Sequence, residues 1–454
     1  MWGREEMESR REFLRKIIVA GGMLAFQPQA LADVHAHRKH TKDPSCTLYR
    51  ALNGSPAMNL AKVIEMMGGI ENVMGPDDVV VIKPNVQWWN QGAPNLAALK
   101  AFVGLVMERP GGFKGEVVLA ENCHRGASPW QHAGWTHVFE RNSDLPKIHH
   151  MGDLAYRMKK EYGSRFSTCH WIDVDSGANR VLGPSEGNGY VYCDGSGGAP
   201  LISYDNGVRG DNYRATIMTY PVFTTDNGTV IDLKNGIWKR GSYTGQPLRF
   251  INFAALNHHS TYCGATSAIK NYLGVTDLSG GPDPSHGGCL TKNYYNFHSF
   301  PFNKWAIGPQ PGMLGTEIGV FMKTIRRADL NITTAEWIGL SSRTDPPVAH
   351  TRAVLACTDP VALDYHATRY ILFPNSRLAI HNPDDLNRPL NHYLVKCAEA
   401  GGGMFDEKHV KVESYDFKRR VLQEDRELVI KGNRTWGTSP KAIMKYLVLR
   451  YGWL

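Results

Sequence analysis

The sequence lacks the local patterns that would assign it to a well-defined class of enzyme or metal protein. None of its eight cysteines is followed by another after two residues, so the spacing specifies neither a zinc ribbon nor a ferredoxin-type cluster. Neither a Gly-x-Ser-x-Gly elbow nor a His-Glu-x-x-His motif occurs, which removes the usual support for a serine hydrolase or a zinc protease. Beyond the first residues, no run approaches the roughly eighteen apolar residues of a membrane-spanning helix. Any assignment of fold and function therefore depends on the patterns that are present.

The first 32 residues predict an export signal. An Arg-Arg-Glu-Phe-Leu run at 10–14 precedes a mildly apolar stretch at 17–26 and an Ala-Leu-Ala sequence at 30–32. A charged head, a short apolar stretch and small residues before a cleavage point make up a secretory signal peptide, and the arginine pair is its twin-arginine form. We expect the twin-arginine translocase to export the chain, with cleavage after Ala32, to the periplasm or another extracytoplasmic place. Because this route carries folded proteins, it favours a cofactor bound before export.

The remaining composition is that of a soluble globular protein with an uneven distribution of charge. Hydrophobic residues make up 42% and charged residues 21% of the 454 residues. The formal net charge is +8, and residues 418–454 hold nine Lys and Arg against three Asp and Glu. Such charge suits an acidic ligand or an anionic membrane surface, whereas nucleic acid is a poor partner for an exported chain.

Two stretches alternate between strand and helix patterns. In the first, we expect strands at 47–51, 78–83 and 116–120, a helix that Ser55 and Pro56 begin, and a helix at 96–107. In the second, we expect strands at 250–256, 328–333 and 348–356, helices at 264–273 and 313–326, and a helix that Asp359 and Pro360 begin and that ends near 372. The region between them is rich in Gly, Asn, Asp, Tyr and Thr and reads as short strands with long loops.

These patterns predict an α/β fold, a single large domain with a layered, mostly parallel sheet in two lobes and a β-rich insertion. The expected segments are the signal peptide at 1–32, an N-terminal α/β lobe at 33–161, the insertion at 162–245, a C-terminal α/β lobe at 246–417 and a basic extension at 418–454. In the extension, a helix from Ser439 places apolar side chains on one side and Lys441 and Lys445 on the other. Packing of this helix on the core is the default expectation, and peripheral membrane contact is the alternative.

Three runs of residues resemble a known family. They are Val-Val-Ile-Lys-Pro-Asn at 80–85, Leu-Asn-His-His at 256–259 with Gly-Ala-Thr-Ser-Ala-Ile-Lys-Asn-Tyr-Leu-Gly at 264–274, and Thr-Asp-Pro-Val-Ala-Leu-Asp at 358–364. In order and separation they resemble the domain-of-unknown-function family 362, over residues 47–417. Some members carry iron–sulfur clusters through an appended ferredoxin-like cysteine run, which this sequence lacks. Asn257 also stands where members commonly place a lysine two residues before the motif histidine, which His259 matches.

Histidines and cysteines gather after residue 257. His259, Cys263, His286 and Cys289 are candidate ligands for a metal ion or an iron–sulfur cluster, because imidazole and thiolate suit zinc, iron, copper or nickel. Adjacent histidines at a strand end point to opposite faces, so we expect one of the pair, His259, to face the site. The alternative is a histidine that orders a loop by hydrogen bonding. For the cysteines as a set, buried thiols, disulfides and ligands all remain open.

A second group of candidates follows the ends of two expected strands. Gly264 and Thr266 open a predicted helix whose free amides favour an anion, and Lys270 and Asn271 lie one turn further along. Lys83 and Asn85 end another buried strand, at the edge where α/β sheets bind ligands. Trp88 and Trp89 follow them and would wall a pocket by stacking on a ring. We expect Lys83, Lys270 and His259 to be catalytic, although Lys270 and Asn271 would serve equally well to fix loops.

Together these features predict a metal- or iron–sulfur-dependent enzyme, with redox chemistry preferred over hydrolysis, acting on a small anionic substrate between Lys83 and His259. The alternative is a non-catalytic carrier or maturation protein that binds a metal, a cluster or an organic ligand and hands it on. Turnover would distinguish the enzyme from stoichiometric binding with release.

Overall fold

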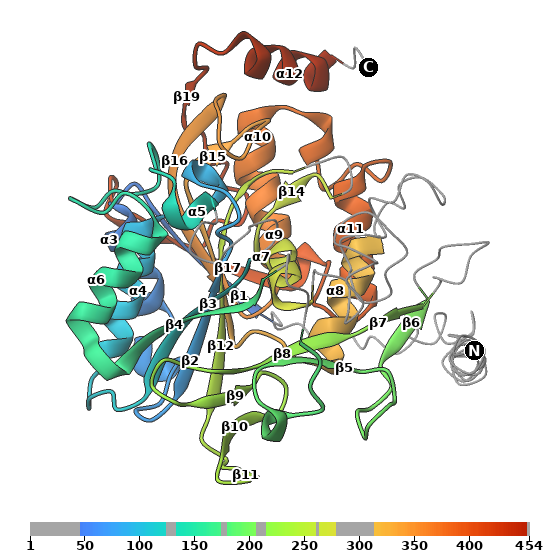
Figure 1. Cartoon of the computed structure of the whole chain (residues 1–454). Helices are drawn as coiled ribbons and strands as arrows, with labels where there is room; N and C mark the ends of the chain where they lie inside the picture. The colour runs from blue at the N-terminus through green and yellow to red at the C-terminus, as the bar shows by residue number, and fades with distance from the viewer. Residues whose placement is uncertain are drawn as a thin grey trace. The chain divides into compact units, whose positions relative to one another are not determined.

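A ten-stranded, mostly parallel sheet forms the centre of the fold (Figure 1). The computed structural model describes residues 46–123, 133–173, 179–205, 215–259, 263–277 and 313–451. Five neighbouring strands are parallel, in the order β15-β12-β2-β3-β4, and β16 pairs antiparallel with both β15 and β1. The α/β prediction is confirmed, because strands from both alternating stretches belong to this one sheet. Their bounds are β1 (Cys46–Leu52), β2 (Val79–Pro84), β3 (Glu116–Cys123), β4 (Phe166–Asp173), β12 (Leu248–Ala255), β15 (Leu330–Gly339), β16 (Val348–Cys357), β17 (Val410–Asp416), β18 (Val421–Gln423) and β19 (Asn433–Thr435).

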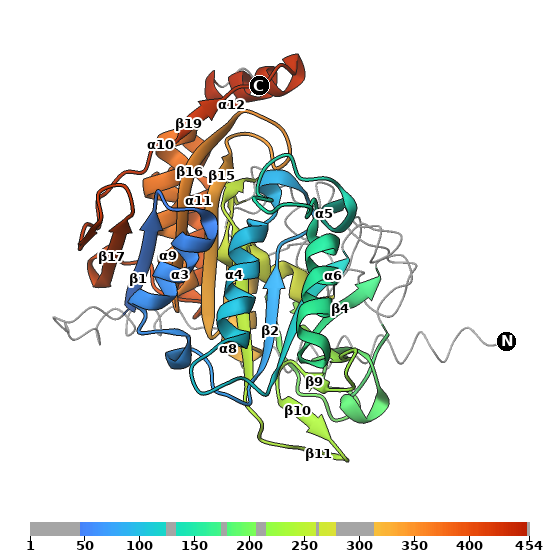
Figure 2. The ribbon, with the colours of Figure 1, turned by 90° about the vertical axis from the view of Figure 1, so that its left-hand side faces the viewer.

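Helices cover both faces of the sheet, which explains the unbroken apolar run of β2. Val80 and Ile82 belong to one hydrophobic cluster, and Val79 and Val81 belong to the other. Successive side chains of a strand point to opposite faces, so a strand covered on both sides is apolar throughout. Figure 2 shows the helices on the first face, which are α3 (Pro56–Met66), α4 (Leu96–Met107) and α6 (Met151–Tyr162). The second face carries α7 (Ala268–Asn271), α8 (Met313–Thr324), α9 (Pro360–Ala367) and α11 (Pro389–Glu399).

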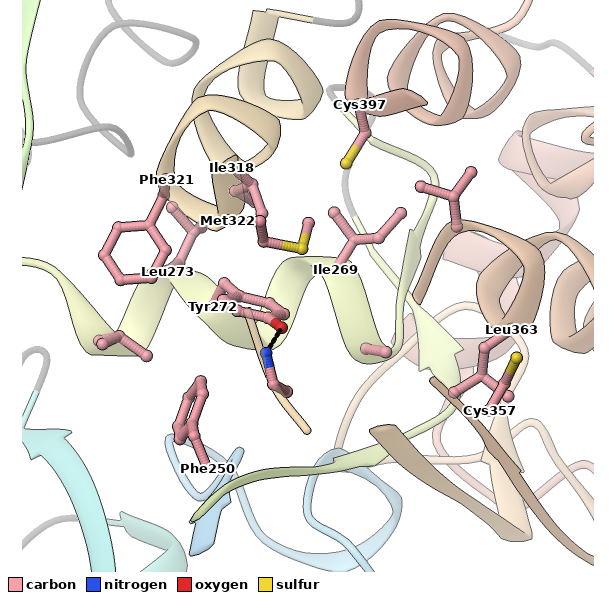
Figure 3. Close-up of a cluster of buried hydrophobic side chains, with 14 of the residues drawn as sticks. Phe250, Ile269, Tyr272, Leu273, Ile318, Phe321, Met322, Cys357, Leu363 and Cys397 are labelled. Carbon is pink, nitrogen blue, oxygen red and sulfur yellow. Dashed lines mark hydrogen bonds between the residues drawn. The ribbon is translucent and has the colours of Figure 1, made fainter. Parts of the chain in front are cut away.

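The second face holds the core that lies beneath α7 (Figure 3). Tyr272 packs its ring edge against Phe250 and Phe321, with centroid separations of 5.9 and 6.0 Å. Its hydroxyl accepts a hydrogen bond from the backbone amide of Ala328, at 2.7 Å. Full burial of a large apolar side chain contributes about 1.5–3 kcal/mol. This packing fixes α7, and with it the chain that leads to the candidate site.

The helix starts predicted at Ser55 and Asp359 are confirmed. The side chain of Ser55 accepts a hydrogen bond from the amide of Met58. Asp359 accepts from the amides of Val361 and Ala362, at 2.9 and 3.0 Å. Such caps satisfy amides that have no partner within the helix. After α9 the chain continues as a π-helical turn, Thr368–Leu372, and then as α10 (Phe373–Ser376). The helix that was expected to end near 372 therefore continues to Ser376 and consists of three parts.

A second, five-stranded antiparallel sheet lies in the chain between β4 and β12. Its order is β11-β10-β9-β8-β5, and a separate hairpin joins β6 to β7. These strands fall within residues 162–245, for which the sequence predicts a β-rich insertion. Their bounds are β5 (Gly189–Tyr192), β6 (Ser203–Asp205), β7 (Ala215–Ile217), β8 (Thr219–Thr224), β9 (Val230–Asp232), β10 (Gly236–Lys239) and β11 (Ser242–Tyr243).

The helix predicted at 264–273 is wrong in its first part. β14 (Ala265–Thr266) pairs with β13 (Asn257–His258), and α7 begins only at Ala268. Gly264 has φ +73°, which lies outside the helical region, and an added Cβ would come within 2.6 Å of the carbonyl oxygen of Ile380. The apolar periodicity of this segment did not reveal the tight turn that Gly264 makes.

The C-terminal helix, α12 (Pro440–Tyr451), packs on the core along one side only, so the default expectation is confirmed in part. Tyr446 is its one buried residue, while Met444 and Tyr451 are 55% and 63% exposed. Leu447 and Leu449 pack partly against the core. Among the described residues, no helix has the length and apolar character needed to cross a membrane.

Candidate functional site

A pocket of about 420 Å³ opens beside the carboxyl ends of three neighbouring parallel strands. Trp88 follows β2, His258 and His259 follow β12, and Arg343 lies in the loop after β15. Loops at such strand ends commonly form the binding sites of α/β sheets. We call this the histidine–arginine pocket, and its lining residues are Trp88, His258, His259, Ser342, Arg343, Thr344, Ile380, Lys445 and Leu449.

His259 lies in a hydrogen-bonded chain whose direction can be assigned. Nη1 of Arg343 lies 3.4 Å from Nε2 of His259, and a guanidinium group can only donate, so Nε2 is the acceptor. The proton of the neutral ring is therefore on Nδ1, which donates to Sγ of Cys263 at 3.2 Å. The Cys263 thiol in turn donates to the carbonyl oxygen of Ala265, at 3.5 Å. His259 thus directs a lone pair, not a proton, toward Arg343.

Cys263 is fully buried behind His259 and does not line the pocket. Burial raises the pKa of its thiol to about 11, although the charges of Lys270 and Arg343 act in the opposite direction. The thiol is therefore protonated at neutral pH. In this state Cys263 orients the His259 ring and is not a nucleophile.

His258 also faces the pocket, so the expectation that one histidine of the pair faces the site is wrong. Its Nδ1 lies 2.9 Å from Nε2 of His381, whose Nδ1 lies 2.7 Å from the hydroxyl of Ser376. The short strand β13 ends at His258, and His259 lies in the turn beyond it, so strand alternation does not separate the two rings. Burial lowers the pKa of His258 well below its usual value and that of His381 to about 3. Both rings are neutral, and Nε2 of His258 is the nitrogen that remains for the pocket.

Two cationic side chains share the pocket wall. Arg343 stands over the ring of Trp88, 4.6 Å from its centroid. Lys445 reaches the pocket from α12, and none of the described lining residues is acidic. Partial burial and, next, the charge of Arg343 lower the pKa of Lys445, while Asp345 acts in the opposite direction. An anion bound between Arg343 and Lys445 would relieve this repulsion.

Lys83 lies in a separate buried cluster. Its Nζ donates to Glu121 at 2.8 Å, to Oδ1 of Asn271 at 2.6 Å and to the Pro84 carbonyl oxygen at 2.7 Å. Asn271 donates back to the Lys83 carbonyl oxygen and to Oδ1 of Asn252. We call these four side chains, Lys83, Glu121, Asn252 and Asn271, the Lys83 cluster. It joins β2, β3 and β12 to α7.

The contacts of the Lys83 cluster are those of a group that holds secondary-structure elements together. Burial is the main influence on both charged groups, lowering the pKa of Lys83 and raising that of Glu121 to about 7, while their mutual attraction opposes both shifts. Lys83 is 2% exposed and already has three hydrogen-bond acceptors. Neither Lys83 nor Asn271 is among the described residues that line the histidine–arginine pocket.

The anion predicted at the start of a helix is supplied by the protein itself. The carboxylate of Asp364, on α9, accepts hydrogen bonds from the amides of Ala268 and Ile269, at 2.8 and 3.0 Å. These are the first amides of α7, so the position that would attract a ligand anion is filled. Lys270 is buried on α7, and Gly264 and Thr266 belong to the β13–β14 turn. Neither Gly264 nor Thr266 lines the pocket in the described part of the chain.

Asn85 connects two strand ends. Its Oδ1 accepts a hydrogen bond from the amide of Ala255, the last residue of β12, at 2.8 Å. Its Nδ2 donates to the carbonyl oxygen of Gly92, at 2.9 Å. This side chain fixes the loop that carries Trp88 and therefore acts on the pocket through the backbone.

The structure brings together two of the four candidate metal ligands. Nδ1 of His259 and Sγ of Cys263 lie near enough for one ion to contact both, but within the described residues no third His, Cys, Asp or Glu joins them. His286 and Cys289 lie outside the described residues. The described donors are thus fewer than the three or four that a protein metal site uses. Six cysteines, Cys46, Cys169, Cys193, Cys263, Cys357 and Cys397, carry free thiols.

Sequence analysis missed three residues of this region, namely Arg343, His381 and Ser376. Arg343 follows β15 in an Ser-Ser-Arg-Thr run at 341–344, and a rule that polar residues after parallel strands form sites would have selected it. No local signal connects His381 to His258, because they are brought together by tertiary packing alone. Trp88 and Trp89 were both predicted to wall a pocket; Trp88 does, whereas Trp89 stacks on His137 with a centroid separation of 4.4 Å.

No family model, curated protein or solved structure matches this chain.

Proposed function

We propose that this protein is an enzyme that binds a small anionic substrate in the histidine–arginine pocket. One observation carries the proposal: two cationic side chains, Arg343 and Lys445, line the same pocket, and none of its described lining residues is acidic. Ser342 and Thr344 add hydroxyl groups at the same wall. A volume of about 420 Å³ is in the range of small-molecule sites. A carboxylate or a phosphate ester has the charge and the size for it.

Substrate binding would change the hydrogen bonding of His259. An anion that takes the guanidinium of Arg343 as its partner competes with the 3.4 Å contact from Arg343 to Nε2. Nε2 then has a lone pair available for a proton of the substrate, which makes His259 the general base. Cys263 keeps the ring in the orientation that this role needs, through its contact with Nδ1.

His258 is the proposed partner in proton transfer. If His381 donates to Nδ1 of His258, then Nε2 of His258 carries a proton and donates into the pocket. If the two bonds reverse their polarity, so that His258 donates to His381 and His381 to Ser376, Nε2 becomes an acceptor. The row of His258, His381 and Ser376 therefore allows Nε2 of His258 either to donate a hydrogen bond to the substrate or to accept one from it, while both buried rings stay neutral.

We further propose a redox reaction that depends on a metal ion or an iron–sulfur cluster. The facing nitrogen and sulfur of His259 and Cys263 support this part. Such a group would supply electron transfer or a Lewis acid. Metal and acid-labile sulfide analysis of protein purified anaerobically tests it. Stoichiometric metal that is lost in His259→Ala and Cys263→Ala, and kept in His149→Ala, is expected, and folded metal-free protein would contradict it.

The test of the substrate class is ligand-induced stabilisation. We expect acetate, benzoate, inorganic phosphate and glycerol phosphate, tried in turn, to include anions that raise the melting temperature, because ligands of the native state stabilise it. Arg343→Ala should abolish the shift, and Arg157→Ala, an exposed arginine on α6, should leave it intact. An unchanged shift in Arg343→Ala would reject the pocket. Binding with no turnover of related compounds would favour the alternative, a carrier protein.

The proposal includes export by the twin-arginine route, which rests on the Arg-Arg-Glu-Phe-Leu run at 10–14. The mass of protein recovered from the periplasm should correspond to cleavage after Ala32. Replacing Arg10 and Arg11 by Lys should retain the full-length chain inside the cell. Unaltered export of that variant would contradict the route.

A further inference from the structure

A second cavity, distinct from the histidine–arginine pocket, is a basic groove. It has a volume of about 580 Å³ and lies between α10, the segment after Leu428 and α12. Arg377, Lys431 and Arg450 are its charged groups, and none of its described lining residues is acidic. Its remaining walls are Phe373, Pro374, Ala379, Asn382 and Val429. We call this the basic groove.

The charges of the basic groove are held in place and exposed. Arg450 donates a hydrogen bond to the backbone carbonyl oxygen of Arg377, which ties α12 to the end of α10. Arg377, Lys431 and Arg450 are all exposed to solvent. Downstream of Glu427 the sequence has five Lys and Arg and no Asp or Glu. The C-terminal segment that contributes Val429, Lys431 and Arg450 to the groove is therefore cationic.

Exposed apolar side chains occur in the groove and on the neighbouring part of α12. Met444 and Tyr451 are seven residues apart on α12 and so lie on one side of the helix, away from its buried residue Tyr446. Trp436, 41% exposed, packs its ring edge against Tyr446, and Val429, 45% exposed, lines the groove. A surface that combines exposed Trp, Tyr and Met side chains with Lys and Arg matches the interfacial region of a bilayer, where aromatic rings and basic side chains gather.

We propose that the basic groove and the exposed side of α12 form a docking surface for an anionic phospholipid bilayer. Arg377, Lys431 and Arg450 take the phosphate of a lipid headgroup, and Trp436, Met444 and Tyr451 enter the interface beside it. Charge complementarity selects this occupant, because the surface has basic groups and no acidic ones for an equally basic second copy of the chain to pair with. This inference does not depend on the enzymatic role of the histidine–arginine pocket.

The two sites are joined by one helix. Lys445 and Leu449 of α12 line the histidine–arginine pocket, and Arg450 of the same helix lines the basic groove. Docking through the groove consequently places the pocket mouth next to the membrane surface. An anionic substrate held at that surface would have a short path into the pocket.

Vesicle co-sedimentation tests the docking surface. We expect the full chain, purified after export, to sediment with vesicles of phosphatidylcholine and phosphatidylglycerol in equal parts, and not with phosphatidylcholine alone. Added salt should weaken the binding, because screening acts on charge at a surface. Lys431→Glu should weaken it about tenfold or more, since each basic residue near an anionic membrane contributes about 1 kcal/mol and the reversal adds repulsion.

The matched control is Lys239→Glu. Lys239 is exposed on β10, at the opposite end of the ribbon from α12 (Figures 1 and 2), and its reversal changes the net charge equally. The Lys239→Glu variant should bind anionic vesicles as well as the original chain does. The double variant Met444→Ser, Tyr451→Ser should lose the part of the vesicle binding that persists at high salt. Equal binding of Lys431→Glu and Lys239→Glu, or no sedimentation with anionic vesicles, would overturn the proposal. Binding of glycerol phosphate to the groove without any binding of vesicles would also overturn the proposal, in favour of a soluble anion as the ligand.

Discussion

Nδ1 of His258 lies 2.9 Å from Nε2 of His381, in a buried pair of which His258 reaches the pocket. Burial lowers the pKa of both rings, that of His381 to about 3, so the folded state holds them neutral. Unfolding exposes them to water, where histidine takes up a proton at about pH 6.5. The unfolded state therefore binds more protons than the folded state at every pH between about 3 and 6.5. In this window the contribution of these two rings to stability rises with pH, and it is lost as the pH falls.

The first prediction concerns that pH dependence. His381→Asn removes one such histidine, so the loss of unfolding free energy between about pH 7 and about pH 5 should shrink by about 2 kcal/mol relative to the original chain. Urea denaturation at the two pH values measures it. Glu121 and Asp364, whose pKa values burial raises to about 7, act in the opposite sense, so the comparison has to be made between variants. His149→Asn, an exposed control, should leave the slope unchanged. An equal slope in His381→Asn would contradict a neutral buried pair.

The second prediction concerns the Lys83 cluster. Lys83→Met leaves the Glu121 carboxyl group buried without its cation, which should cost about 3–5 kcal/mol of unfolding free energy. Glu121→Gln should also destabilise, and the double variant should lose less than the two single losses combined, by about 1–3 kcal/mol. Denaturant unfolding of the four proteins completes this cycle.

A surface pair supplies the matched control for that cycle. Lys62 and Glu65 form an ion pair across one turn of α3, with Glu65 67% exposed. Lys62→Met should cost less than about 1 kcal/mol, because solvent screens exposed pairs. Additive losses in the Lys83–Glu121 cycle, or a Lys83→Met cost as small as that of Lys62→Met, would show that the buried pair does not couple these strands.

The third prediction concerns the start of α7. Asp364→Asn keeps the size of the side chain but leaves one oxygen where two accept hydrogen bonds from Ala268 and Ile269. One buried amide then lacks an acceptor, which should cost about 1–3 kcal/mol. Amide hydrogen exchange should quicken most in Ala268 and Ile269. Asp153→Asn, at a partly exposed first turn of α6, should cost less, and an equal cost would argue against a special role for Asp364.

Much of the fold follows from the sequence, whereas the site follows only in part. The continuous apolar run of β2 and the caps at Ser55 and Asp359 are local signals, and local signals specify strands and helix starts. The helix prediction for the segment after His259 was wrong because a single glycine with a left-handed backbone conformation, Gly264, makes a turn where the sequence pattern is helical. Lys83 was misread because a polar residue ending a buried strand looks the same whether it meets a ligand or Glu121. Its partner comes from another strand, and only the tertiary structure reveals it.

The last prediction joins the Lys83 cluster to the chain that follows α7. A Cβ added at Gly274 would lie 2.6 Å from Nζ of Lys83 and 2.8 Å from Oε1 of Glu121, so the buried pair would have to move. Gly274→Ala should therefore cost about 1–3 kcal/mol, in the range of overpacked cores. At Gly104, in α4, the nearest atom to an added Cβ is the Tyr162 hydroxyl at 3.8 Å, and alanine there should stabilise by about 0.5–1 kcal/mol because it favours the helix.

Opposite signs for the two glycine variants in denaturant unfolding are the expected result, since the same methyl group meets a buried ion pair in one place and makes an ordinary van der Waals contact in the other. In Gly274→Ala combined with Lys83→Met, the cost of the alanine should fall, because the ammonium group that it contacts has been removed. An undiminished cost in that combination would mean that the strain lies in the contact with Glu121 or in the backbone, and not in the contact with Lys83.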